Sequence, residues 1–143
     1  MAFGGKGREP GQYGTGHGFT PSPDGKQITV ADRPNAEIDR FLPDGKYVDT
    51  VSLPAGSLAC DIDYTEGLAI VGCLDGPDKT KGAPIYLLKD DQIVSTLMPK
   101  EDLGLADFVH VHNATLTKVG DKLYVIAQAW NPGDFAILEQ VKE

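Results

Sequence analysis

GHGFTPSPDGKQITVADRPNAEIDRFLPDGKYVDTVSL, residues 16–53, contains four runs of strand length separated by turn sequences. The turns are PDG at 23–25, RPN at 33–35 and PDG again at 43–45. Short runs rich in β-branched and aromatic residues, bounded by Gly, Pro, Asn and Asp, are typical of antiparallel strands. The stretch therefore predicts a four-stranded antiparallel meander.

Two further units repeat this plan along the 143-residue chain, and the last one stops one strand short. A shift of 43 residues brings His17 onto Cys60, and a shift of 95 brings it onto His112, with the flanking apolar pattern in step. Repeats of about 40 to 50 residues with four short strands each are typical of β-propeller blades. We therefore expect an all-β fold in one domain, residues 1–143, with blades at about 14–53, 58–98 and 108–143.

The first unit strongly resembles an NHL repeat, and the match fades in the later units. The residues that carry the resemblance are Gly11-Gln12-Tyr13, His17-Gly18, Asp24-Gly25, Val30-Ala31-Asp32-Arg33, Asn35, Ile38, Phe41 and Asp44-Gly45. The peptidylglycine amidating lyase domain is an enzyme built on similar repeats, and this chain resembles it only at the level of the repeat. The resemblance implies half of a six-bladed propeller, in which the first strand of every blade lines a central channel.

Three blades leave two apolar sheet faces uncovered, because a closed ring takes at least four. The simplest expectation is a homodimer in which two chains close a six-bladed ring. Residues Met1 to Gly5 of the partner would then supply the missing strand of the third blade. The alternatives are a fragment of a longer gene product and an open three-sheet solenoid with capped ends.

His17, Cys60 and His112 occupy equivalent repeat positions and would converge on the channel. In propellers like the amidating lyase domain, histidines at such positions hold a catalytic zinc, and a His, Cys, His set is chemically acceptable to Zn²⁺. The alternative is that these side chains only form hydrogen bonds across the channel. His110 is expected at the rim, just before the strand that carries His112.

Asp61 and Asp63 lie two residues apart in the second unit and are expected to point to the same side. They could hold a cation such as calcium or supply a general base, although carboxylates at such positions more often accept hydrogen bonds from backbone N–H groups. Trp130 either packs in the core or lines a groove for a ligand.

The two cysteines flank a predicted hairpin with Glu66-Gly67 at its turn. A two-residue turn places Cys60 directly opposite Cys73. Two buried free thiols are the expected state, and a redox or metal role is the alternative.

The formal charge is −8, from 21 acidic and 13 basic residues, and no cationic stripe is present. Nucleic acid and anionic membranes are therefore not expected partners. The first residues lack the apolar core of a signal peptide, which favours a cytoplasmic location.

The leading functional hypothesis is a binding module that recognises a small molecule or a protein on the ring face or in the channel. The ligand-binding residues would be His17, His110, His112, Asp61 and Trp130, with help from the loop at 74–82. The alternative is a metal-dependent lyase or hydrolase, whose zinc is held by His17, His112 and either Cys60 or His110.

Overall fold

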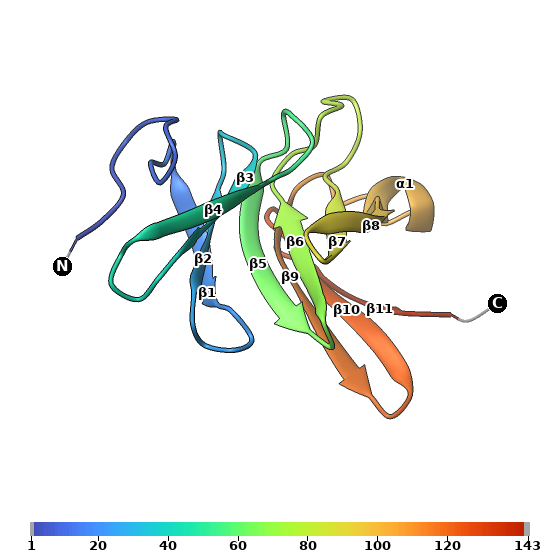
Figure 1. The fold of residues 1–143 in the computed structure, drawn as a ribbon. Coiled ribbons are helices and arrows are strands. Elements are labelled where there is room, and N and C mark those ends of the chain that lie inside the picture. Colours follow the sequence, from blue (N-terminus) through green and yellow to red (C-terminus); the bar gives the residue numbers. More distant parts are fainter. Residues whose placement is uncertain (1, 142–143) are drawn as a thin grey trace.

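A computed structural model describes residues 2–141 as three antiparallel sheets, with no closed barrel (Figure 1). Sheet 1 consists of β1 (Gly16–Pro21), β2 (Ile28–Asp32), β3 (Glu37–Phe41) and β4 (Tyr47–Ser52). Sheet 2 consists of β5 (Ala59–Thr65), β6 (Leu68–Cys73), β7 (Ile85–Lys89) and β8 (Gln92–Leu97). Sheet 3 consists of β9 (Val111–Val119), β10 (Lys122–Ala129) and β11 (Phe135–Glu139). The all-β expectation is confirmed.

The turns follow the residue types that the sequence places in them. Glu66 and Gly67 both have positive φ, 54° and 75°, which is the two-residue turn that matches the twist of a hairpin. Gly25 and Gly45 end the two PDG turns, also at positive φ. These turns keep consecutive strands adjacent, so each sheet follows the order of the sequence.

Sheet 2 lies between the other two and is apolar on both faces (Figure 1). One face packs on sheet 1, where the core residues include Ala31, Ile38, Val71 and Leu88. The opposite face packs on sheet 3 through a second set of residues. These are Ile70, Ala83, Ile85, Phe108, Val111, Ala114, Leu116, Val125, Ala127 and Ala129. Burial on both faces explains why LAIVGC is apolar throughout instead of alternating with polar residues.

A single short helix, α1 (Pro99–Leu103), connects sheets 2 and 3 within the described residues. It ends at Gly104 in the left-handed conformation, whose N–H donates to the carbonyl of Pro99. No helix in residues 2–141 is long and apolar enough to cross a membrane.

The first strands of the three sheets, β1, β5 and β9, lie side by side (Figure 1). A glycine permits the contact between β1 and β5. A Cβ atom built on Gly18 would lie 2.5 Å from the carbonyl oxygen of Cys60 and 2.4 Å from Oδ1 of Asp61. Side chains from three separate repeats therefore meet on one surface, which we call the inner-strand surface.

The outer faces of sheets 1 and 3 are only partly covered within this chain. On sheet 1, Phe3 and Tyr13 pack on Phe41, with ring centroids 5.0 and 5.6 Å from the Phe41 ring. The expectation that Met1 to Gly5 forms a strand of a partner falls partly outside the described residues, because Met1 is not among them. Residues 2–5 form no strand in this chain.

Replacing Gly18 with Ala should destabilise the fold by about 1 to 3 kcal/mol, because the new methyl group would meet backbone atoms that cannot rotate away. Gly16→Ala is the matched control, since its Cβ atom would lie 3.5 Å from its nearest neighbour, Val30 Cγ1. Urea unfolding followed by circular dichroism measures both changes. Equal midpoints for the two variants would show that β1 and β5 are not in close contact.

Candidate functional site on the inner strands

Each of the three inner strands contains one extra residue relative to its partner strand. The extra residue is Cys60 in β5 and His112 in β9, while in β1 His17 and Gly18 together oppose Ala31. The flanking pairs are Gly16 with Asp32, Phe19 with Val30, Ala59 with Cys73, Asp61 with Gly72, Val111 with Ala129 and Asn113 with Gln128. Such β-bulges redirect a side chain out of the regular alternation. The positions that the sequence repeat aligns are therefore the positions of three equivalent bulges.

The bulges bring His17 and His112 together. Their ring centroids are 5.0 Å apart and the rings are nearly perpendicular. His17 Nδ1 lies 2.7 Å from the carbonyl oxygen of Cys60, so this nitrogen carries the proton and donates it. Its Nε2 atom is then the unprotonated one in the neutral ring.

The same tautomer follows for His112 from its neighbours. The Asn113 amide nitrogen donates to Oδ2 of Asp61 at 3.0 Å, which fixes the orientation of the Asn113 side chain. The amide oxygen of Asn113 then lies 3.2 Å from Nδ1 of His112 and accepts its proton. Both imidazoles therefore leave Nε2 available to a ligand.

The Cys60 thiol does not join the two imidazoles. Its sulfur is buried and accepts a hydrogen bond from Arg33 Nη2 at 3.1 Å, and only the backbone carbonyl of Cys60 reaches His17. Within residues 2–141, one group of three potential metal-ligating side chains has its ligand atoms within 4.8 Å of one another. It consists of Asp32, Glu37 and Asp39. Of the set expected for zinc, His17 and His112 therefore lie together, whereas the Cys60 thiol is buried against Arg33.

The bulge also corrects the expected cysteine pairing. Cys73 pairs with Ala59, and Cys60 is the unpaired extra residue. A two-residue turn sets the register near Glu66-Gly67, but the bulge shifts it by one before the cysteines are reached. Both cysteines are free and buried, as expected.

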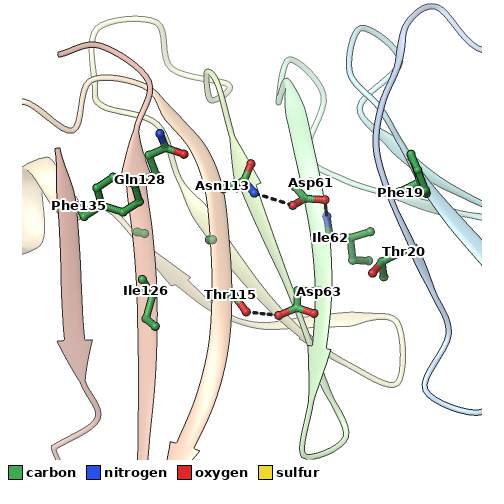
Figure 2. A pocket seen from close by; sticks show the side chains of 12 residues that line it. Phe19, Thr20, Asp61, Ile62, Asp63, Asn113, Thr115, Ile126, Gln128 and Phe135 are labelled. Carbon is green, nitrogen blue, oxygen red and sulfur yellow. Dashed lines mark hydrogen bonds between the residues drawn. The ribbon is translucent and has the colours of Figure 1, made fainter. Parts of the chain in front are cut away.

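Asp61 and Asp63 connect β5 to β9 (Figure 2). Asp61 accepts from Asn113 and from the backbone N–H of Ile62, and Asp63 accepts from the hydroxyl of Thr115. Burial raises the pKa of the Asp61 carboxyl above its usual range, and the nearby His17 and His112 oppose that rise. The two carboxylates point together as expected and already have hydrogen-bond donors.

A cleft of about 420 Å³ lies over these carboxylates (Figure 2). Its polar floor consists of Asp61, Asp63, Asn113 and Thr115, and its flanks are mostly apolar. Phe19 stands on one side, and Ile126, Gln128 and Phe135 stand on the other. The sequence repeat located the floor, but it gave no indication that Asn113 and Thr115 would bind the two carboxylates.

His110 and Trp130 form a different pair. His110 Nδ1 donates to the carbonyl of Leu74 at 2.6 Å, and the Trp130 ring lies 6.2 Å from the His110 ring, edge to face. Trp130 is 57% exposed and therefore is not a core residue. Its backbone N–H donates to the carbonyl of His110. The loop at 74–82 is held nearby by Lys79, whose ammonium donates to the carbonyls of Gly56 and Gly76.

No protein-family model and no curated protein matches this chain. Two solved structures have a similar fold. One is a protein of unknown function from Bacteroides caccae, with a TM-score of 0.57 and 17% identity over 78% of this chain and 38% of that chain. The other is described as a putative 6-phosphogluconolactonase from Bacteroides uniformis ATCC 8492, with a TM-score of 0.56 and 20% identity over 99% of this chain and 46% of that chain.

These comparisons show a shared fold and nothing further. This chain spans less than half the length of each of the two proteins. Identities of 17% and 20% do not carry a residue role from one protein to the other.

Cys60 and Cys73 should both resist labelling by a thiol reagent in the folded protein at neutral pH. Both thiols are buried, and burial raises the pKa of each, so little thiolate is present or accessible. We expect labelling by 5,5′-dithiobis(2-nitrobenzoic acid) to follow global unfolding and then to yield two thiols per chain. Rapid labelling of the native protein would contradict the buried position of Cys60.

Proposed function

We propose that this chain is a propeller-type binding protein that holds a small polar ligand on the inner-strand surface. The observation that carries the proposal is the convergence of three bulged strands. It brings the His17 and His112 rings together, and Asn113 links His112 to Asp61 in the floor of the neighbouring cleft. Binding sites typically combine a few convergent polar groups with a concave surface.

The chemistry of the cleft favours a ligand with several hydroxyl groups. In the cleft, Asp61 and Asp63 accept hydrogen bonds and Asn113 both donates and accepts. Outside its lining, the imidazoles of His17 and His112, with the proton on Nδ1, accept at Nε2. A ligand hydroxyl can serve every one of these groups, because it is both donor and acceptor. The negative formal charge of the chain disfavours a strongly anionic ligand unless a cation accompanies it.

A second candidate is a metal-dependent hydrolase or lyase. Two imidazole rings whose centroids lie 5.0 Å apart, each with an unprotonated nitrogen, favour it, as does a lactonase-named protein among the structures of similar fold. Two imidazoles are one ligand short of a catalytic zinc site, which takes three protein ligands and one open position. The remaining ligand would come from Asp61 after a side-chain rotation, or from the equivalent surface of a second chain.

The uncovered sheet faces support closure of a ring by a second copy of this chain. Phe19 is 71% exposed, whereas its repeat equivalents Ile62 and Ala114 are 4% and 2% exposed because a neighbouring sheet covers them. The outer face of sheet 3, with Ile126 and Ile137, is equivalent to the face of sheet 1 that covers Ile62. Two chains with three sheets each would form a six-bladed, NHL-like ring in which each Phe19 is covered.

The ligand-binding proposal predicts that Asn113→Ala weakens binding of a polyhydroxylated ligand by about 10-fold, because Asp61 loses its side-chain donor and His112 loses its acceptor. A panel of monosaccharides and sugar acids, screened by saturation-transfer NMR, identifies the probe, and calorimetry then measures the variants. His110→Ala is the control, since His110 binds Leu74 instead. If no panel member binds, or if both variants bind equally, the proposal is wrong.

The metal candidate predicts one zinc per inner-strand surface in purified protein, lost in both His17→Ala and His112→Ala. Inductively coupled plasma mass spectrometry measures the zinc content. His110→Ala should retain the metal, because its imidazole lies at the Leu74 carbonyl. Zinc-free protein that gains none on titration would remove this candidate and leave the polar-ligand proposal intact.

Ring closure predicts a dimer by sedimentation velocity, converted to a monomer by Phe19→Asp or Ile137→Asp. Both substitutions place a charge on a face that the second chain would cover. Val94→Asp is the matched control, because Val94 is an exposed apolar residue of β8 in sheet 2. A wild-type chain that sediments as a monomer at micromolar concentration contradicts closure by a second copy.

A further inference from the structure

Three carboxylates meet on the outer face of sheet 1, away from the inner-strand cleft. Asp32 on β2 pairs with Glu37 on β3, and Asp39 lies two residues further along β3 on the same face. One oxygen of each carboxylate lies within 4.8 Å of the others. Asp32 and Asp39 are buried, and Glu37 is partly exposed.

Two polar atoms at this cluster are buried without a hydrogen-bond partner among the described residues. One is Oδ2 of Asp39, a residue that is only 1% exposed, and the other is the hydroxyl of Tyr13. The second carboxylate oxygen of Asp39 accepts from the hydroxyl of Thr50. A buried carboxylate oxygen without a donor is costly, so Asp39 Oδ2 indicates a missing positive partner.

The second atom, the Tyr13 hydroxyl, belongs to the segment that precedes sheet 1. The Tyr13 ring packs on Phe41, which follows Asp39 by two residues on β3. Burial raises the pKa of the Tyr13 phenol first, and the charges of Asp39 and Asp32 raise it further. Tyr13 is therefore the candidate for a fourth oxygen beside the three carboxylates.

The charges around the cluster do not balance. Asp32 receives neutral donors, the backbone N–H groups of Gly14 and Thr15 and the amide of Asn35. Arg8 is the basic group that acts on Glu37. Asp39 has only the Thr50 hydroxyl. Bringing three carboxylates together in a partly dry site calls for an added cation or an added proton.

We propose that Asp32, Glu37, Asp39 and Tyr13 form a site for a hard divalent cation of the Ca²⁺ class. All four contribute oxygen atoms, which hard cations prefer, and the site has no nitrogen or sulfur ligand that would select zinc. Ca²⁺ accepts irregular coordination with six to eight oxygens, so water completes the shell through the partly exposed side at Glu37. The cation would supply the partner that Asp39 Oδ2 lacks.

This site would tie the segment that precedes β1, residues 2–15, to sheet 1. Tyr13 packs on Phe41, and the backbone next to it donates to Asp32. A cation shared between Tyr13 and the three carboxylates would add a link across the same contact. Removing it should loosen this segment while the inner-strand cleft, which contains none of these residues, keeps its ligand.

The test is a Ca²⁺ titration of the full chain by calorimetry, with thermal unfolding in Ca²⁺ and in chelator. We expect saturable binding at one site per chain, and a Tm higher in Ca²⁺ by about 3 °C or more. Asp39→Asn should abolish both effects and should raise the Tm in chelator, because it removes one of three repelling charges. Asp121→Asn, at an exposed turn, should bind Ca²⁺ like the wild type.

A pH series separates a bound cation from a shared proton. Burial raises the pKa of both Asp39 and Glu37 above the usual carboxyl range, next to Asp32, Tyr13 and Arg8. In chelator, the stability that protonation provides is present at low pH and is lost as pH rises through the raised values. The Tm gain from Ca²⁺ should therefore be larger at about pH 7.5 than at about pH 5.

Three results would overturn the site. The first is a wild-type Tm that is equal in Ca²⁺ and chelator at neutral pH, which would leave the shared proton as the explanation. The second is a Ca²⁺ effect that survives Asp39→Asn, which would place the ion elsewhere. The third is a Ca²⁺ effect of the same size at both pH values.

Discussion

The structure depends on one constraint: both faces of sheet 2 are apolar, so sheet 2 must be covered on two sides. Sheet 2 satisfies the constraint within the chain, because sheets 1 and 3 cover its two faces. Sheets 1 and 3 each have one covered face, and part of the other is exposed. Each Å² of apolar surface that stays in water lacks about 25 cal/mol of the stabilising free energy that burial would provide. This cost is the physical reason to expect a further partner surface.

The same stacking creates the candidate site. Sheets that pack face to face bring their first strands to a common side, and three bulges at equivalent positions then redirect three side chains. The bulge in β5 carries cysteine instead of histidine, and there the side chain turns inward toward Arg33. The backbone carbonyl of Cys60 orients His17 instead. A change in one repeat thus converts a possible ligand into a group that fixes the tautomer of its neighbour.

Acidic side chains on the strands have two different roles in this chain. Asp61 and Asp63 receive donors from Asn113 and Thr115 and so join β5 to β9. Asp39, on β3 of sheet 1, keeps one buried oxygen without a donor. Asp61 and Asp63 therefore stabilise the contact between two strands and also border the cleft. Asp39 instead has a buried oxygen that lacks a hydrogen-bond donor. Burial and partners, and not residue type, separate these roles.

The sequence by itself determined the strands, the turns and the grouping into three sheets, because these follow from local patterns such as the two PDG turns and Glu66-Gly67. It also aligned His17, Cys60 and His112 through the repeat. Only the tertiary structure decided which atoms these residues present. A bulge inserts a residue without changing the apolar pattern, so the register of Cys60 against Cys73 could not be read from spacing. Likewise Tyr13 packs on Phe41 only because the segment that precedes β1 folds back over sheet 1, a contact between segments that no local pattern encodes.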